Sequence, residues 1–276
     1  MSSMASDFSS TVESLIALFS LPGHEDTMPV GIPLMIRAVP ILIGAFPVTL
    51  QLLVVSLSIG FCLAVPLALA RLSRNPLLWM PAYGYIYFFR GTPLLIQLYL
   101  LYYGSGQFRE FWESIGIWWF FRDAWWPCIL ALSLNTAGYT AEILRGAIQA
   151  VPHGEVEAAK SCGMSGLLLF RRIIFPKALR VALPAYSNEV ILMLQATSLA
   201  SLVTIYDMLG VANIIYNRTY AFYEMYITIA AMYLVITYLL VWGFRTVEYR
   251  LSGHLRDRPG TATATATVVA MPAGLR

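Results

Sequence analysis

The sequence predicts an all-α integral membrane protein with about five transmembrane helices. Three observations predict this fold class: hydrophobic residues make up 58% of the 276 residues, charged residues make up only 12%, and the mean hydropathy is +0.67. So little charge cannot cover the surface of a soluble globule of this length. Long apolar stretches also reach the roughly 20 residues that a spanning helix needs. The bilayer is therefore the expected solvent.

The N-terminal segment, residues 1–37, comes before the first long apolar stretch. It lacks a basic start and its own apolar run is short, so it does not have the pattern of a cleaved signal peptide. We expect a periplasmic or interfacial segment that includes an amphipathic helix near the outer face of the membrane.

Five stretches supply the predicted spans. Two of them, residues 38–70 and 225–244, contain no Asp, Glu, Lys or Arg. The other three contain one charged residue each: 77–103 contains Arg90, 124–144 contains Glu142, and 181–206 contains Glu189. Because five is an odd number, the two termini are expected on opposite sides of the membrane.

Basic residues predict the orientation, because segments near span ends that are rich in Lys and Arg stay in the cytoplasm. They gather after the first, third and fifth spans: Arg71, Arg74, Lys160, Arg171, Arg172, Lys177, Arg180, Arg245, Arg250, Arg256 and Arg258. The other connecting segments hold most of the acidic residues. The prediction is a periplasmic N-terminus and a cytoplasmic C-terminus.

The connection between the second and third spans is rich in tryptophan. Five of the seven tryptophans lie in residues 112–126. This suits the headgroup level, where an aromatic ring has both an apolar and a wet neighbour; the aromatic core of a soluble cap is the alternative. At the other end of the chain, residues 251–276 are low in complexity and predict a cytoplasmic, disordered tail.

The sequence shows no catalytic residues and no metal site. The three cysteines and three histidines are scattered and form no cluster with carboxylates. No Gly-Lys dipeptide occurs, so the phosphate-binding loop G-x-x-x-x-G-K-[ST] is absent. The prediction is a chain that is not an enzyme and does not itself hydrolyse ATP.

The loop 151–180, between the third and fourth spans, begins with a short polar helix. Pro152 suits the first turn of a helix, and Glu155 and Glu157 favour its positive end. Alanines follow, and Gly163 supplies a C-terminal stop. The expected helix has roughly two to three turns, and its small residues let a partner protein approach closely.

The same loop carries a spaced motif. It consists of Glu157-Ala158-Ala159, three residues, Gly163, nine residues, Ile173, one residue and Phe175-Pro176. This motif resembles the "EAA…G…I-x-L-P" loop of permease subunits in bacterial ATP-binding-cassette (ABC) importers, with Phe175 in place of the usual Leu. Three further stretches are similar to the polar amino-acid branch of that family, above all to its histidine/lysine/arginine/ornithine and opine permeases: 88–98, 134–148 and 182–203.

The resemblance implies the type I ABC importer permease fold, with residues 38–250 as the transmembrane domain and 151–180 as its coupling loop. It implies a multi-pass chain of the bacterial inner membrane that translocates polar amino acids, above all basic ones, or opines. The implied partners are an ATP-binding-cassette ATPase dimer, a homologous permease subunit or a second copy of this chain, and a periplasmic solute-binding protein, with no nucleic acid. ATP and Mg²⁺ would bind the partner ATPase, and this chain would hold no cofactor.

The resemblance also implies which residues couple the chain to the ATPase. They are Glu155, Glu157, Ala158, Ala159, Gly163 and Arg171, with Glu157 as the main coupling residue. The alternative is an ordinary cytoplasmic turn whose alanines serve helix propensity alone. Anchoring by the positive-inside rule explains the bases Arg171, Arg172 and Lys177 equally well.

Polar groups inside the spans indicate a substrate pathway, because an ionisable side chain there costs at least about 2.5–3.5 kcal/mol and is functional by default. The candidates are Arg90, Asn135, Tyr139, Glu142, Asn188, Gln195, Thr197 and Ser198. Asn135, Tyr139 and Glu142 share one helix face. Glu142 could bind an ammonium or cationic group there, or it could pair with Arg90 or Arg145.

Three of these features have a purely structural alternative. Pro93, close to Arg90, predicts a kink that is either a hinge or a packing feature around a buried ion pair. The small polar residues of the fourth span also suit helix packing in lipid. For Glu189 we expect an ion pair with a base of the loop, such as Arg180.

An ion-coupled secondary amino-acid transporter is the alternative function. Such proteins have internal repeats and paired discontinuous helices, which five spans with one docking loop do not match. A membrane scaffold without a transport role would leave the intramembrane charges without a purpose.

Overall fold

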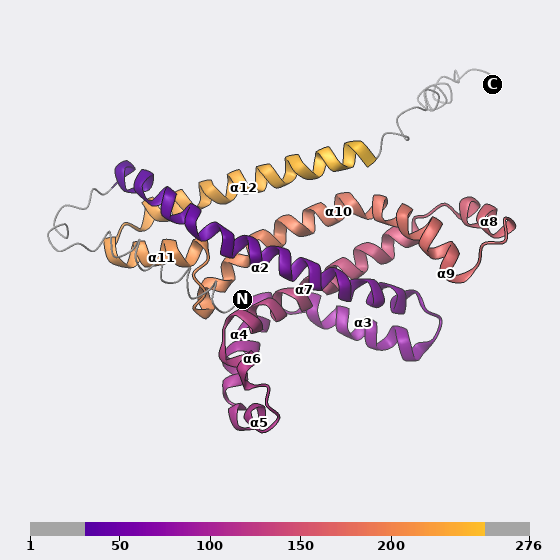
Figure 1. Cartoon of the computed structure of the whole chain (residues 1–276), viewed down its shortest axis with the longest axis horizontal. Coiled ribbons are helices and arrows are strands. Elements are labelled where there is room, and N and C mark those ends of the chain that lie inside the picture. Colours follow the sequence, from indigo (N-terminus) through magenta and orange to yellow (C-terminus); the bar gives the residue numbers. More distant parts are fainter. Residues whose placement is uncertain (1–30, 252–276) are drawn as a thin grey trace, which may run out of the picture.

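The computed structural model describes residues 31–251, and every regular element in this range is a helix, as predicted. The helices form an elongated bundle with a shorter arm at one side (Figure 1). Two predictions, the N-terminal amphipathic helix and the disordered tail, concern residues 1–30 and 252–276, which lie outside the described residues.

Two long helices form the centre of the bundle. Helix α2 (Ile32–Leu72) contains the first predicted span, and it packs along α7 (Trp125–Gln149), which contains the third. The two helices approach closely at Gly60, where an added Cβ would lie 2.2 Å from Cγ2 of Thr136. Only glycine fits at this crossing, which is how small residues bring membrane helices together.

The second predicted span consists of two helices, α3 (Pro76–Gly91) and α4 (Leu94–Gly106). Proline has no N–H to continue the helical ladder, and it pushes the residue before it towards extended backbone. Thr92 is extended accordingly, with φ −113° and ψ 142°, and Pro93 begins the next helix as its N-cap. The predicted kink is thus a complete break.

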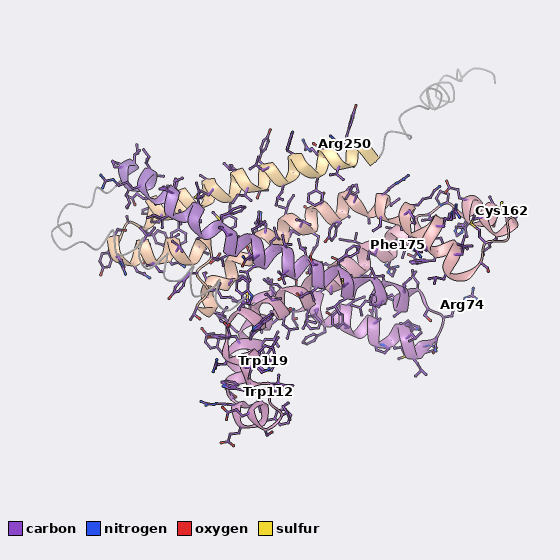
Figure 2. The ribbon with its side chains drawn as sticks, in the orientation of Figure 1. Arg74, Trp112, Trp119, Cys162, Phe175 and Arg250 are labelled. Carbon is purple, nitrogen blue, oxygen red and sulfur yellow. The ribbon has the colours of Figure 1, made fainter. Side chains whose placement is uncertain are left out.

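The tryptophan-rich connection forms the arm that extends from the bundle in Figure 1. It contains α5 (Arg109–Ser114) and α6 (Trp118–Arg122), and the labelled Trp112 and Trp119 lie in it in Figure 2. Aromatic rings pack against one another here, with Trp112 and Phe121 centroids 4.5 Å apart. The Trp119 side chain is exposed, and its position at the headgroup level stays a prediction.

After α7 the chain forms α8 (His153–Ser161), α9 (Gly166–Leu169), a π-helical turn (Phe170–Ile174) and α10 (Phe175–Ala196). Helix α10 begins before the predicted fourth span at 181. A 3₁₀ segment (Thr197–Val203) follows and continues that span.

Helix α11 (Met208–Thr219) was not predicted from the sequence. Its N-cap is Asp207, whose carboxylate accepts hydrogen bonds from the backbone N–H groups of Leu209 and Gly210. The Thr49 hydroxyl of α2 accepts a hydrogen bond from the Met208 N–H, so this helix start is joined to the bundle centre. Helix α12 (Phe222–Leu251) then contains the fifth predicted span.

Helix length and composition test the span count only in part. Within residues 31–251, two helices are long and apolar enough to cross a membrane, Ile32–Leu72 and Phe222–Arg250, and a third is obtained if Gly166–Val203 and Met208–Thr219, bent by 49°, count as one span. The total of five and the orientation therefore stay predictions. The α2–α3 joint with Arg74 and the α8 region with Cys162 lie at the same end of the bundle (Figure 2), as two cytoplasmic joints would.

Candidate coupling helix and polar pocket

Helix α8 has the length that the sequence predicts, and it stops for the predicted reason. Gly163 has φ +80°, the left-handed conformation that favours glycine. Its N–H donates to the Lys160 carbonyl, and the Met164 N–H donates to the Ala159 carbonyl. This pair of bonds is the Schellman motif, so the end of the helix is fixed by backbone geometry. Pro152 is the N-cap and does not lie within the first turn.

One face of α8 packs on the bundle and the other is free. Ala159 is buried, and Val156 is partly buried against the hydrophobic cluster where α2, α3, α7 and α10 meet. Glu157 and Ala158 are exposed, and no residue of the described range forms an ion pair with Glu157. The motif therefore leaves its acid, Glu157, and one alanine, Ala158, available to another protein.

The predicted coupling residue Glu155 has a partner within the chain. Its carboxylate pairs with the Nζ of Lys177, which is in the first turn of α10. This ion pair joins the first turn of α8 to α10, the helix that carries the fourth predicted span. Arg171, also predicted to couple, is exposed on the π-helical turn between them; π-helical turns are frequent at functional sites.

The break at Pro93 is held together by two amide side chains. Because Pro93 has no N–H, the Phe89 carbonyl four residues earlier has no backbone donor. Gln97 Nε2 donates to this carbonyl at 3.0 Å and Asn135 Nδ2 at 3.1 Å. Gln97 Nε2 also lies 3.0 Å from the Thr92 carbonyl, and its Oε1 accepts from Asn135 at 3.2 Å. The buried Asn135 thus joins α7 to the break and does not line the pocket described next.

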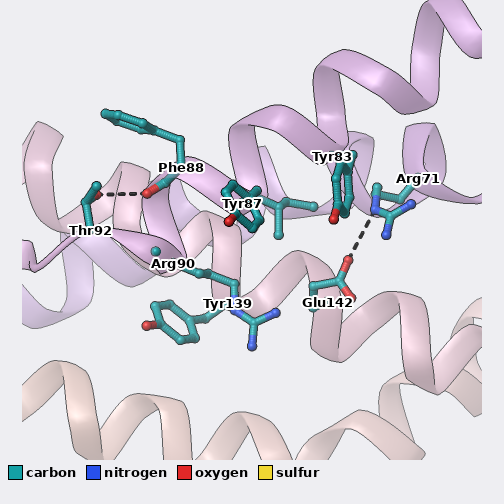
Figure 3. A pocket seen from close by; sticks show the side chains of 10 residues that line it. Arg71, Tyr83, Tyr87, Phe88, Arg90, Thr92, Tyr139 and Glu142 are labelled. Atoms are coloured by element: carbon teal, nitrogen blue, oxygen red, sulfur yellow. Dashed lines mark hydrogen bonds and ion pairs between the residues drawn. The ribbon is translucent and has the colours of Figure 1, made fainter.

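A polar pocket of about 530 Å³ lies where α2, α3 and α7 meet, close to this break (Figure 3). We call it the α3–α7 pocket. It is lined by Arg71, Tyr83, Ile86, Tyr87, Phe88, Arg90, Gly91, Thr92, Tyr139 and Glu142. Its volume is within the range of pockets for small molecules. Three of the predicted pathway residues therefore meet in it: Arg90, Tyr139 and Glu142.

Glu142 is paired with two guanidinium groups. Its Oε2 accepts from Nε and Nη2 of Arg145 at 2.9 and 2.8 Å. Its Oε1 faces Nε of Arg71 at 3.4 Å, and both of these atoms are buried without a hydrogen bond. Of the two structural partners predicted for Glu142, the pair with Arg145 is confirmed. The pair with Arg90 is not formed, and Arg71 of α2 takes that place.

Arg90 also lines the pocket; it is within electrostatic range of Glu142 but forms no ion pair with it. Its guanidinium carbon is 5.0 Å from the centroid of the Tyr139 ring, a cation–π contact. No acidic residue within 31–251 forms an ion pair with Arg90. Both side chains point into the pocket in Figure 3.

The other predicted pathway residues lie elsewhere. Asn188 lines a second pocket, of about 210 Å³, between α10 and α12, beside Arg245 and Glu248. Gln195 is exposed. Thr197 is buried and donates to the Leu194 carbonyl, and Ser198 donates to the Gln195 carbonyl. Both of these bonds are local, to carbonyls of the last turn of α10.

The expected ion pair between Glu189 and Arg180 is wrong. Both residues are on α10, about two and a half turns apart, so they are on opposite faces. Glu189 is buried against α7 instead, where the Thr136 hydroxyl donates to its Oε1 at 2.8 Å.

Sequence reasoning missed two residues of these sites, Arg71 and Gln97. Arg71 was counted only among the basic residues that follow the first span. It lies in the last turn of α2, from which its side chain reaches Glu142. For Gln97 a signal was available, because it is a long amide in an apolar run four residues after Pro93.

The described residues form a helical bundle with one broken predicted span, an exposed short helix at one end and a pocket between α2, α3 and α7, and these features fit the permease class that the sequence motif predicts. Residues 56–253 match the family of binding-protein-dependent transport system inner membrane components. The chain belongs to this family, and it is therefore a transport permease subunit. It has the type I ABC importer permease fold.

Two relatives illustrate the range of the family. The nopaline transport system permease protein NocM of Agrobacterium fabrum is 50% identical over 229 residues, which cover 83% of this chain and 95% of that protein. The histidine/lysine/arginine/ornithine transport system permease protein HisM of Escherichia coli is 45% identical over 213 residues, 75% of this chain and 87% of that one. The crystal structure of an amino acid ABC transporter with histidines has a TM-score of 0.70 and 35% identity, and the match covers 81% of this chain and 100% of that chain.

Proposed function

We propose that this chain is the permease subunit of an ATP-driven importer that carries opines or basic amino acids across the bacterial inner membrane. The observation that carries the proposal is the exposed Glu157-Ala158 surface of α8, held in place by the Gly163 stop and the contacts of Val156 and Ala159. The substrate class follows from the relatives, which are named for the transport of nopaline, octopine and the basic amino acids.

In this assembly the energy comes from another chain. An ABC ATPase dimer holds ATP and Mg²⁺ and docks on α8, and a periplasmic solute-binding protein delivers the substrate on the opposite side. A homologous permease subunit or a second copy of this chain completes the membrane part. The ion pair between Glu155 and Lys177 connects α8 to α10, the helix that carries the fourth predicted span, and supports the proposal that a displacement of α8 reaches that span.

The test of the importer is uptake into proteoliposomes. We expect uptake of octopine or L-arginine to need ATP on the ATPase side and the binding protein on the other. Uptake that is driven by an ion gradient with no ATPase present would show the alternative, an ion-coupled transporter.

The test of the coupling surface is the charge reversal Glu157→Lys. We expect the variant to insert normally but to lose co-purification with the ATPase, because the docking surface changes sign. The matched control is Glu110→Lys, the same change at an exposed residue of α5 in the arm, which should retain the ATPase. If Glu157→Lys retained both the ATPase and full transport, the coupling role of α8 would be disproved.

A further inference from the structure

The charges around the α3–α7 pocket do not favour a cation. The carboxylate of Glu142 is shared by Arg71 and Arg145, so this trio carries a net charge of +1. Both carboxylate oxygens of Glu142 already face guanidinium nitrogens, Oε2 those of Arg145 and Oε1 that of Arg71. An ammonium or guanidinium group of a ligand would have to compete with both arginines for Glu142.

Arg90 adds a second positive charge, and this one is available. It lies near the middle of the predicted span 77–103, where water is scarce and an uncompensated charge is costly. Its guanidinium carbon lies over the Tyr139 ring, and this contact leaves the guanidinium N–H groups available as donors. A planar carboxylate matches that row of donors in a bidentate manner.

The other acid near Arg90 does not fill this role. Glu189 of α10 is within electrostatic range of Arg90, but it forms no ion pair with it and accepts its hydrogen bond from Thr136. Among residues 31–251 the guanidinium of Arg90 therefore lies over an aromatic ring and forms no ion pair, and the two carboxylates within electrostatic range of it, Glu142 and Glu189, are each bound to other groups.

We propose that the α3–α7 pocket binds a carboxylate group of the transported compound through Arg90, with Tyr139 holding the guanidinium in place. This proposal rests on the proposed function and specifies which end of the substrate the pocket recognises. Glu142 is then a positioning residue that keeps Arg71 and Arg145 in place. Basic amino acids and opines share a carboxylate, so one site serves both.

The experiment measures binding of radiolabelled L-arginine to the purified permease–ATPase complex without the solute-binding protein, which would itself bind the carboxylate. Octopine and agmatine compete for the label; agmatine keeps the guanidinium of arginine and lacks its carboxylate. We expect octopine to displace the label and agmatine to do so at least about 10-fold more weakly. Equal displacement by agmatine would overturn the proposal.

Variants of Arg90 test whether this residue binds the carboxylate. We expect Arg90→Gln to weaken L-arginine binding about 10- to 100-fold and Arg90→Lys to weaken it less, because the charge stays and the planar fork is lost. Arg74→Gln, the same change at an exposed base outside the pocket, should bind as the wild type does. Co-purification with the ATPase checks that each variant is folded. Unchanged binding by Arg90→Gln would refute the proposal, and if that variant does not assemble, unchanged binding by Arg90→Lys refutes it.

Uptake by wild-type proteoliposomes distinguishes a failure of the proposed function from a failure of the carboxylate site. If no opine or basic amino acid is taken up with ATP and binding protein present, the proposed function fails. If uptake occurs but the wild-type complex alone binds no L-arginine, or binds it independently of Arg90, only the carboxylate site fails.

Discussion

The crossing of α2 and α7 at Gly60 makes a sharp prediction about stability. A Cβ at this position would lie 2.2 Å from Cγ2 of Thr136 and 3.2 Å from the Ser133 carbonyl oxygen. Carbon atoms at optimal separation are about 3.5–4.0 Å apart, so Gly60→Ala requires the helices to separate by an ångström or more. Thr136 cannot rotate its methyl group away freely, because its hydroxyl is held by Glu189.

We therefore expect Gly60→Ala to destabilise the protein by about 1–3 kcal/mol, the usual cost of overpacking. A change of 1 kcal/mol shifts the melting temperature by about 2–4 °C for a domain of 150–250 residues, so the expected loss is about 2–12 °C. The measurement is thermal unfolding of the purified complex in detergent.

Two further variants test the reason for this loss. Gly44→Ala, on the same helix with nothing within 4 Å of its Cβ, should leave the melting temperature unchanged or raise it. Thr136→Ser removes the clashing methyl group and keeps the hydroxyl, so in the Gly60→Ala background it should restore part of the lost stability. If Gly60→Ala melted like Gly44→Ala, or if Thr136→Ser gave no rescue, the contact would not be the cause.

Two predictions concern the helix break and the helix stop. Gln97→Leu should lower the free energy of unfolding by about 1–3 kcal/mol, because it removes the donor to the Thr92 carbonyl and the acceptor of Asn135. Gln107→Leu, at an exposed position, is its control in thermal unfolding. Equal melting temperatures of the two variants would contradict the role of Gln97. Gly163→Ala should lower the free energy of unfolding by about 1–2 kcal/mol, because residue 163 has a positive φ. Gly154→Ala, within α8, should stabilise the helix instead. Melting temperatures that shift in the same direction in both variants would refute this account.

The coupling helix was predictable because its signals are local. The alanines and glutamates of residues 155–159 set the helix, and Gly163 ends it in the one conformation that glycine adopts more easily than other residues. Each of these preferences acts within a few residues, so they gave the length and the end of the helix, while the start is one residue later than predicted because Pro152 is the N-cap. The ion pair between Glu155 and Lys177 was not predictable, because it depends on how the loop folds back.

The polar contacts within the bundle depend on long-range packing. The sequence indicates that Pro93 frees a carbonyl, but it does not indicate that Gln97 and Asn135, from two different helices, both reach it. In the same way, Arg71 reaches Glu142 only because α2 packs along α7. Patterns of hydrophobicity determine which helices exist, and they leave open which side chains meet.

Helix α11 was missed because its apolar run is short and contains Asn213, Asn217 and Arg218. The start signal was present, since Asp207 stands directly before Met208 as an N-cap residue does. A search for spans longer than about 20 residues does not detect a helix of 12 residues.

The exposed cap of α8 gives the protein a natural label site. Cys162 is the residue directly after the helix, and it is exposed in the same region as Glu157. Of the other two cysteines, Cys128 is buried and Cys62 is in the predicted span 38–70, which lipid would surround. A charged maleimide dye thus has one water-facing thiol to modify, and its fluorescence would report ATPase attachment on the unmutated chain in real time.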